Sequence, residues 1–102
     1  MMKYGLKPVV IEQIKQVFAA HPEIDQAILY GSRAKGTHHN GSDIDLCLRG
    51  ESLSLPLQLK IENELECLLL PYKIDLSIFH QLDNSDLIEH INRLGVEFYR
   101  RA

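Results

Sequence analysis

One short, wholly apolar segment limits the folds open to this chain. Residues 24–30 indicate a short strand whose last four residues, Ala-Ile-Leu-Tyr, are all apolar, and Gly31 and Ser32 follow directly. Successive side chains of a strand point to opposite faces, so a strand that is apolar throughout must be covered on both sides. The segment therefore predicts an inner strand of a sheet with helices packed on both faces, and the glycine and serine end it.

The patterns around this strand supply the other elements. Three segments carry apolar residues at helical spacing, at 8–20, 57–68 and 87–94. Strands are predicted by alternation at 42–48 and 73–79, and as a short edge strand at 96–99. Asn84 or Ser85 can cap the last helix, and the glycine-rich stretch 31–41 indicates a loop with one helical turn. The expected fold class is α/β (α+β), a small mixed β-sheet flanked by helices, in the order helix, strand, loop or helix, strand, helix, strand, helix.

Composition limits the domain organisation. A chain of 102 residues that is 45% hydrophobic has material for one core, so residues 1–102 are expected to form a single domain. No apolar run approaches the ~20 residues of a membrane span, and no signal-peptide segment follows the start, which predicts a cytoplasmic protein without membrane contact. The net charge of −3 disfavours a protein that holds long nucleic acid by its phosphates.

The cysteines carry no metal-type spacing. Cys47 and Cys67 lie in apolar runs and are expected to be buried, reduced thiols. His38 and His39 lie in the loop that leads to the aspartates, where they could serve as a base or a metal ligand, but adjacent histidines in a polar loop are expected to be solvent-exposed. The other three histidines lie at element ends or on a helix and are expected to have surface or capping roles.

Three aspartates form the first candidate site. Asp43 and Asp45 are two residues apart on one predicted strand and point to the same face, where Asp75 from a later strand can join them. Two carboxylates ~5 Å apart at an effective dielectric of ~20 repel by about 3 kcal/mol, so such a cluster needs a cation or protons. Hard oxygen ligands suit Mg²⁺ or Mn²⁺. The alternative is that these are solvated residues on an exposed sheet face.

The residues after the apolar strand form the second candidate site. Gly31 and Ser32 are small enough for a phosphate to approach the backbone, whose N–H groups can donate to it. The Ser32 hydroxyl can also donate to a phosphate, or it can cap a helix that follows the strand. Arg33 and Lys35 add positive charge nearby, although a cation in a loop is more often solvated.

These two sites together resemble a known signature. The segment Gly31-Ser32-Arg33-Ala34-Lys35-Gly36, followed by Ser42-Asp43-Ile44-Asp45-Leu46, resembles the minimal nucleotidyltransferase (MNT) signature of the polymerase-beta superfamily, as found in proteins paired with HEPN-domain proteins. Asp75 stands on a later strand, where that family places its third carboxylate. Lys35 stands where arginine is frequent, which keeps the positive charge.

The resemblance implies the nucleotidyltransferase fold and a magnesium-dependent enzyme. Its catalytic and metal-binding residues would be Asp43, Asp45 and Asp75. Its nucleotide-binding residues would be Gly31, Ser32, Arg33 and Lys35. The enzyme would move a nucleoside monophosphate, by default AMP from ATP, onto a hydroxyl acceptor and release pyrophosphate, with Mg²⁺ or Mn²⁺ as cofactor.

The resemblance also implies a partner in trans. Such short chains commonly work beside a separate small helical protein of the HEPN type, as the antitoxin of a toxin-antitoxin pair. Two alternatives stay open: a non-catalytic nucleotide-binding or docking subunit that neutralises a partner by binding alone, and a metal-dependent phosphohydrolase that releases phosphate. A homodimer is also open, and the residues identify neither the base nor the acceptor.

Overall fold

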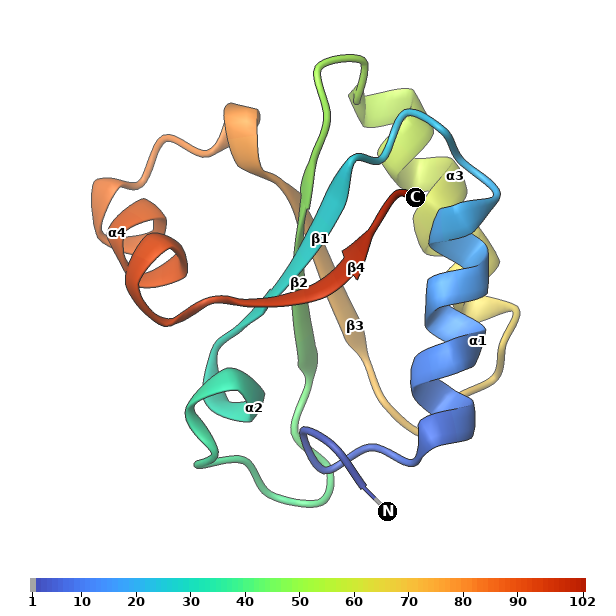
Figure 1. The fold of residues 1–102 in the computed structure, drawn as a ribbon, viewed down its shortest axis with the longest axis vertical. Helices are drawn as coiled ribbons and strands as arrows, with labels where there is room; N and C mark the ends of the chain where they lie inside the picture. Colours follow the sequence, from blue (N-terminus) through green and yellow to red (C-terminus); the bar gives the residue numbers. More distant parts are fainter. Residues whose placement is uncertain (1) are drawn as a thin grey trace.

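A four-stranded mixed sheet forms the middle of the computed structural model, which describes residues 2–102 (Figure 1). Its strands are β1 (Gln26–Tyr30), β2 (Ile44–Arg49), β3 (Ile74–Ile78) and β4 (Val96–Arg100). They lie in the order β3-β2-β1-β4, with β1 antiparallel to both β2 and β4, and β2 parallel to β3. The predicted fold class is confirmed, including the inner position of β1 and the edge position of β4.

The helices lie where the sequence predicts them, although the one predicted at 57–68 begins two residues earlier, at Leu55, and includes Pro56 in its first turn. They are α1 (Pro8–Ala19), α2 (Ser32–Lys35), α3 (Leu55–Glu66) and α4 (Ser85–Leu94), with a 3₁₀ turn η1 (Phe79–Gln81). A proline stands in the first turn of both α1 and α3, because its fixed φ and missing N–H suit that position. The Asn84 side chain caps α4 by accepting from the N–H groups of Asp86 and Leu87, at 3.0 and 3.2 Å. Of the two residues predicted as this cap, Asn84 is therefore the one used.

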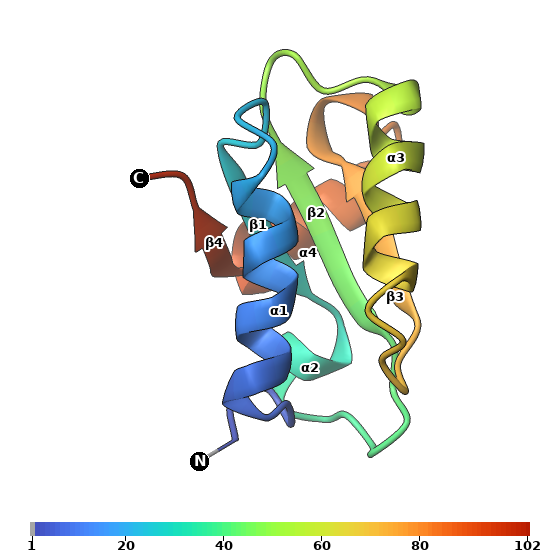
Figure 2. The same cartoon turned by 90° about the vertical axis from the view of Figure 1, so that its right-hand side faces the viewer.

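Two long helices cover one face of the sheet. Figure 2 shows α1 and α3 side by side in front of the strands. Every second residue of β2 points into this core, since Ile44, Leu46 and Leu48 are fully buried. From the helices, Phe18 and Ile61 are equally inaccessible. The apolar half of the predicted alternation in β2 is thus confirmed.

One helix covers part of the opposite face. In Figure 1 α4 lies on the far side of the sheet from α1 and α3. Its Ile91 packs into a second, smaller cluster with Ile28, Tyr30 and Cys47. Beyond this cluster the same face is open, because Asp75 is exposed. Asp75 therefore lies on a part of this face that is open to solvent.

The two cysteines differ, which corrects one expectation. Both are free, but Cys47 is buried and Cys67 is exposed. Cys67 follows the last residue of α3 as its C-cap, so it lies outside the apolar stripe of that helix. Within residues 2–102, no helix has both the length and the apolar character needed to cross a membrane.

Candidate functional site

The parallel pairing of β2 and β3 brings the aspartates together. Asp45 and Asp75 are partners in register, so their carboxylates project from the same face of neighbouring strands. Asp43 stands two residues before Asp45, just ahead of β2. Burial, and then the negative charges of Asp75 and Asp43, raise the pKa of Asp45, while Arg33 and His90 act in the opposite direction. The three carboxylates of the predicted site therefore lie close enough together to interact electrostatically.

This cluster of three carboxylates is accessible to solvent. Asp43 and Asp75 are exposed and Asp45 is half-buried. No three acidic, histidine or cysteine side chains in residues 2–102 converge as a ready-made metal cluster. The donor set is all carboxylate, which suits a hard divalent cation, and a cation would offset the repulsion that raises the pKa of Asp45. The residues fit Mg²⁺ or Mn²⁺ with part of its coordination supplied by other molecules.

Gly31 lies directly against one of these carboxylates. Its φ is +75°, in the left-handed region that favours glycine. A Cβ at this position would lie 2.3 Å from Asp45 Oδ2, closer than any real contact. The backbone of the predicted phosphate loop and the predicted metal site are therefore adjacent, and only glycine fits between them.

The loop after Gly31 turns into the short helix α2. Gly31 itself is the N-cap and no side chain caps the helix, so Ser32 does not take the alternative role of helix cap. Ser32 is half-buried in the first position of α2. Lys35, in the last turn, is exposed and makes no ion pair with any residue in 2–102. Both residues stay available to a ligand.

Arg33, which the sequence predicts to bind nucleotide, lies buried beside the aspartates. It is 2% exposed, and its guanidinium is used within the fold. Nε and Nη2 donate to the Ser42 carbonyl at 3.2 and 2.8 Å, and Nη1 donates to the Tyr4 carbonyl at 2.8 Å. The guanidinium carbon also lies 5.0 Å from the centre of the Tyr72 ring. Arg33 thus fixes the residue just before Asp43, because the forked group reaches two backbone carbonyls at once.

The N-terminal turn belongs to the same scaffold, which sequence reasoning missed. Tyr4 supplies the carbonyl that accepts from Arg33, and its ring lies 6.4 Å from that of Phe98. Gly5 has a φ of +73°, and a Cβ there would lie 2.3 Å from His38 Nε2. Gly5 directly after Tyr4 is a local turn signal that could have indicated this ordered segment.

His90 is the second residue that the sequence did not reveal. Its Nε2 accepts a hydrogen bond from the Gly31 N–H at 3.2 Å, although 59 residues separate them. The expected surface or capping role is therefore wrong for this histidine. The spacing of Leu87 and Ile91 marks the buried side of α4, and His90 lies at the edge of that stripe. This position at the edge of the buried stripe was the feature of the sequence that could have indicated an inward-facing histidine.

The family assignment follows from comparison with known proteins. Residues 12–102 match the family model described as polymerase beta, nucleotidyltransferase. The chain therefore belongs to the polymerase beta nucleotidyltransferase family, and the resemblance drawn from the glycine-serine and aspartate motifs is confirmed. Comparison with curated protein sequences finds no significant match.

Solved structures of toxin-antitoxin complexes share the fold. A chain from the crystal structure of a toxin-antitoxin with AMP-PNP has a TM-score of 0.72 and 21% identity, over 88% of this chain and 73% of that chain. The MntA-HepT toxin-antitoxin gives 0.67 and 16%, over 92% and 73%. A complex of the tri-AMPylated Shewanella oneidensis HEPN toxin with MNT antitoxin gives 0.66 and 16%, over 90% and 71%. At these identities the likeness establishes a common fold, the nucleotidyltransferase fold.

Proposed function

We propose that this chain is a magnesium-dependent nucleotidyltransferase that moves AMP from ATP onto a hydroxyl group. The observation that carries the proposal is the contact of Gly31 with Asp45. It puts a glycine loop suited to phosphates beside a carboxylate that shares its strand face with Asp75. Membership of the polymerase beta nucleotidyltransferase family supports the same reaction class.

The loop would bind the outer phosphates of the triphosphate. Gly31 has no side chain to block their approach, and Ser32 offers its hydroxyl. Lys35 is an exposed cation on the same short helix and would add charge to this end of the site. Arg33 would act indirectly by holding Ser42, and with it the start of the aspartate strand.

The aspartates would hold the metal and receive the proton. Asp43, Asp45 and Asp75 are the ligands proposed for Mg²⁺, with Mn²⁺ as a substitute. When bound, the cation would neutralise the triphosphate and the departing pyrophosphate. Asp75 is exposed on edge strand β3, so an acceptor hydroxyl can reach it and give up its proton there.

The bonds exchanged define the products. The acceptor oxygen would form a bond to the α-phosphorus, and the bond from that phosphorus to the β-bridging oxygen would break. Pyrophosphate would carry away the negative charge, and the acceptor proton would pass to Asp75 or to solvent. Orientation and charge stabilisation would provide most of the rate gain, because the phosphoryl centre needs no covalent intermediate with the protein.

The similar structures support a proposal for the partner and for the base of the nucleotide. One of these toxin-antitoxin structures contains AMP-PNP, and another pairs an AMPylated HEPN toxin with an MNT antitoxin. We infer by analogy that this chain uses ATP and acts as the antitoxin to a small helical HEPN-type protein. Its organisation as one domain and a cytoplasmic location stay predictions, as does a homodimer.

A labelled-nucleotide assay tests the transfer. The full chain is incubated with Mg²⁺, ATP labelled at the α-phosphate, and a co-expressed HEPN-type protein. Label on that protein together with released pyrophosphate is the expected result, and Asp75→Asn should remove both. Release of inorganic phosphate without label transfer would instead indicate the phosphohydrolase alternative.

The docking alternative has one observation in its favour. Leu55 and Leu59, one turn apart on α3, are each 56% exposed, which suits a surface that another protein covers. In that case the Asp43→Asn, Asp45→Asn double variant would still neutralise the toxic partner in cells. Loss of neutralisation in this variant, with unchanged binding to the partner, would favour the enzyme.

A further inference from the structure

We propose that His90 is a positioning residue that holds Gly31 in the backbone conformation required for nucleotide transfer. The inference rests on the proposed function, since it concerns the same loop. It adds a residue from the C-terminal helix to a site otherwise built from the first two strands and β3. The argument depends on one hydrogen bond, on what fixes the imidazole and on what Gly31 touches.

The hydrogen bond satisfies the Gly31 N–H, a backbone donor that has no partner in the sheet. The pairing of β1 with β2 ends at Tyr30 and Asp45, so the Gly31 N–H has no strand partner. His90 Nε2 accepts from it at 3.2 Å, which requires Nε2 to carry no proton. The ring lies edge-on to Tyr30, with centroids 6.1 Å apart and planes at 78°. One aromatic contact and one hydrogen bond thus orient the imidazole.

The helix that carries the imidazole is fixed at both ends. Asn84 caps its first turn, and Gly95 follows its last residue. A Cβ on Gly95 would lie 2.6 Å from Ile28 Cγ2 on β1, so the helix end approaches the strand closely. Ile91, next to His90, is 2% exposed in the cluster beneath α4. The position of His90 relative to β1 is therefore set by packing.

Gly31 is held from two directions as a result. The Asp45 carboxylate lies where its side chain would be, and His90 binds its N–H. Glycine has more backbone freedom than any other residue, so the loop needs an external contact to keep one conformation. Loss of the His90 acceptor should let Gly31 move relative to Asp45 and so separate the phosphate loop from the metal site.

Two substitutions distinguish the hydrogen bond from the packing. His90→Phe keeps an aromatic ring against Tyr30 but removes the acceptor, whereas His90→Gln keeps an acceptor at nearly the same reach. We expect the phenylalanine variant to raise KM for MgATP about five- to tenfold, with a smaller change in kcat. Its melting temperature should fall by less than about 5 °C, and glutamine should restore most of the affinity. A phenylalanine variant equal to wild type, or a glutamine variant as weak as phenylalanine, would overturn the inference.

A measurement without nucleotide separates this inference from the proposed function. In the ¹⁵N NMR spectrum of the free full-length chain, Nε2 of His90 should appear as the unprotonated ring nitrogen. The Gly31 amide should shift and exchange faster with solvent in His90→Phe, but not in His90→Gln. An unchanged Gly31 amide in His90→Phe would overturn the positioning role even if the chain transfers AMP. If the amide responds as expected but no triphosphate binds, the proposed function alone fails.

Discussion

The two faces of the sheet differ in what they contribute. The face under α1 and α3 is continuous apolar core, with Ile44 and Leu46 fully buried. The face under α4 is apolar only around Ile28, Tyr30 and Cys47, and beyond them it carries the aspartates. Alternation along β2 and β3 places their core residues on one face of the sheet and Asp45 and Asp75 on the other, so the two faces serve stability and chemistry separately.

The face under α4, here called the open face, also carries an electrostatic cost that the face under α1 and α3, the closed face, lacks. Burial and the neighbouring Asp75 and Asp43 raise the pKa of Asp45, so its charged form is disfavoured in the fold. A carboxylate with such a cost is more typical of a ligand-binding site than of a packed core. Substitutions on the two faces should therefore change different measured quantities.

The largest effect is expected on the open face. Asp45→Asn should reduce AMP transfer on the order of a thousandfold, since a half-buried carboxylate that faces the proposed metal is lost. The free energy of unfolding without metal should not decrease, because the repulsion by Asp75 and Asp43 is removed. Transfer rates and urea unfolding in EDTA measure the two quantities. A variant with normal transfer would remove Asp45 from the site.

The raised pKa of Asp45 predicts that the free energy of unfolding depends on pH. A raised pKa means that the protonated form of Asp45 is favoured in the folded state. Its stabilising contribution is fully present below the ordinary value of 3.8 and is lost as the pH rises through the raised folded pKa. Relative to Asp45→Asn, the metal-free wild type should thus lose stability across that window. A constant difference in the free energy of unfolding between the wild type and Asp45→Asn from pH 3 to pH 7 would contradict the proposed electrostatic cost.

On the closed face, the next largest effect is on stability. Leu46→Ala should lower the free energy of unfolding by about 3 kcal/mol, because a fully buried side chain leaves a cavity. Leu46→Met, which conserves volume, is the control and should cost less than about 1.5 kcal/mol. Denaturant unfolding measures both. If the alanine variant lost less than the methionine control, the closed face would not be the stabilising one.

Arg33 connects the segment just before Asp43 to the N-terminal turn and should have an intermediate effect. Arg33→Lys keeps the charge but cannot reach both the Ser42 and Tyr4 carbonyls, so unfolding should become easier by about 2 kcal/mol. Lys35→Arg, at an exposed position, is the matched control and should leave stability unchanged. Reduced ATP affinity with full stability in Arg33→Lys would instead support the direct phosphate contact expected from the sequence.

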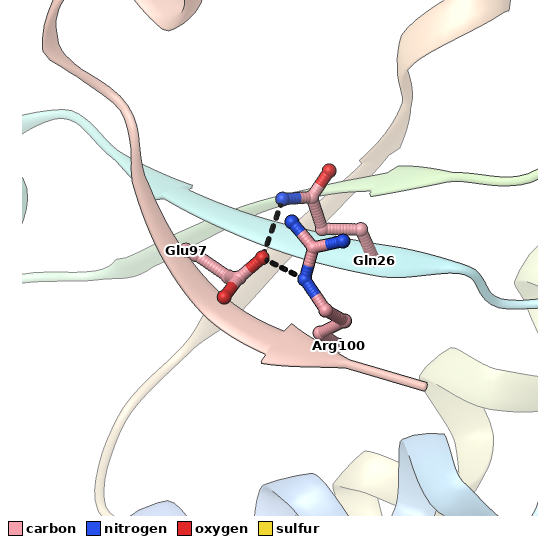
Figure 3. A network of polar contacts seen from close by, with 3 residues as sticks. All are labelled: Gln26, Glu97 and Arg100. Atoms are coloured by element: carbon pink, nitrogen blue, oxygen red, sulfur yellow. Dashed lines mark hydrogen bonds and ion pairs between the residues drawn. The ribbon is translucent and has the colours of Figure 1, made fainter. Parts of the chain in front are cut away.

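The smallest effect is expected in a polar network outside the site. Figure 3 shows Glu97 on β4 accepting from Gln26 Nε2 at 2.8 Å and from Arg100 Nε at 2.6 Å. These side chains are solvent-accessible, so Glu97→Gln should cost only about 0.2–1 kcal/mol, and less at high salt. Thermal unfolding at two salt concentrations tests this. A cost as large as that of Leu46→Ala would show that polar surface stabilises the chain as much as core does.

Local patterns were sufficient for the fold and for part of the site. Alternation in β2 predicted the buried leucines and the opposite orientation of Asp45, and the short apolar strand predicted where Gly31 lies. Asp43 precedes the strand, which begins at Ile44, so the face that Asp43 shares with Asp45 stays a prediction. Spacing along the chain carries this information, since both features depend on residues close in sequence. The confirmed family signature is likewise a local pattern.

Contacts between distant segments could not be predicted in the same way. Two cations two residues apart gave no sign that Arg33 is buried while Lys35 is exposed. The partner of Arg33 at Tyr4 and the partner of Gly31 at His90 lie 29 and 59 residues away. Which of several similar side chains turns inward depends on the assembled sheet and on α4, so tertiary packing decides it.

Calorimetric titration with MgATP tests the central claim most directly. The wild-type chain is compared with the Asp43→Asn, Asp45→Asn double variant, with and without Mg²⁺. If the open face is the nucleotide and metal site, the wild type binds only with Mg²⁺ and the double variant does not bind. Equal binding by both proteins, or none by either, would contradict this account.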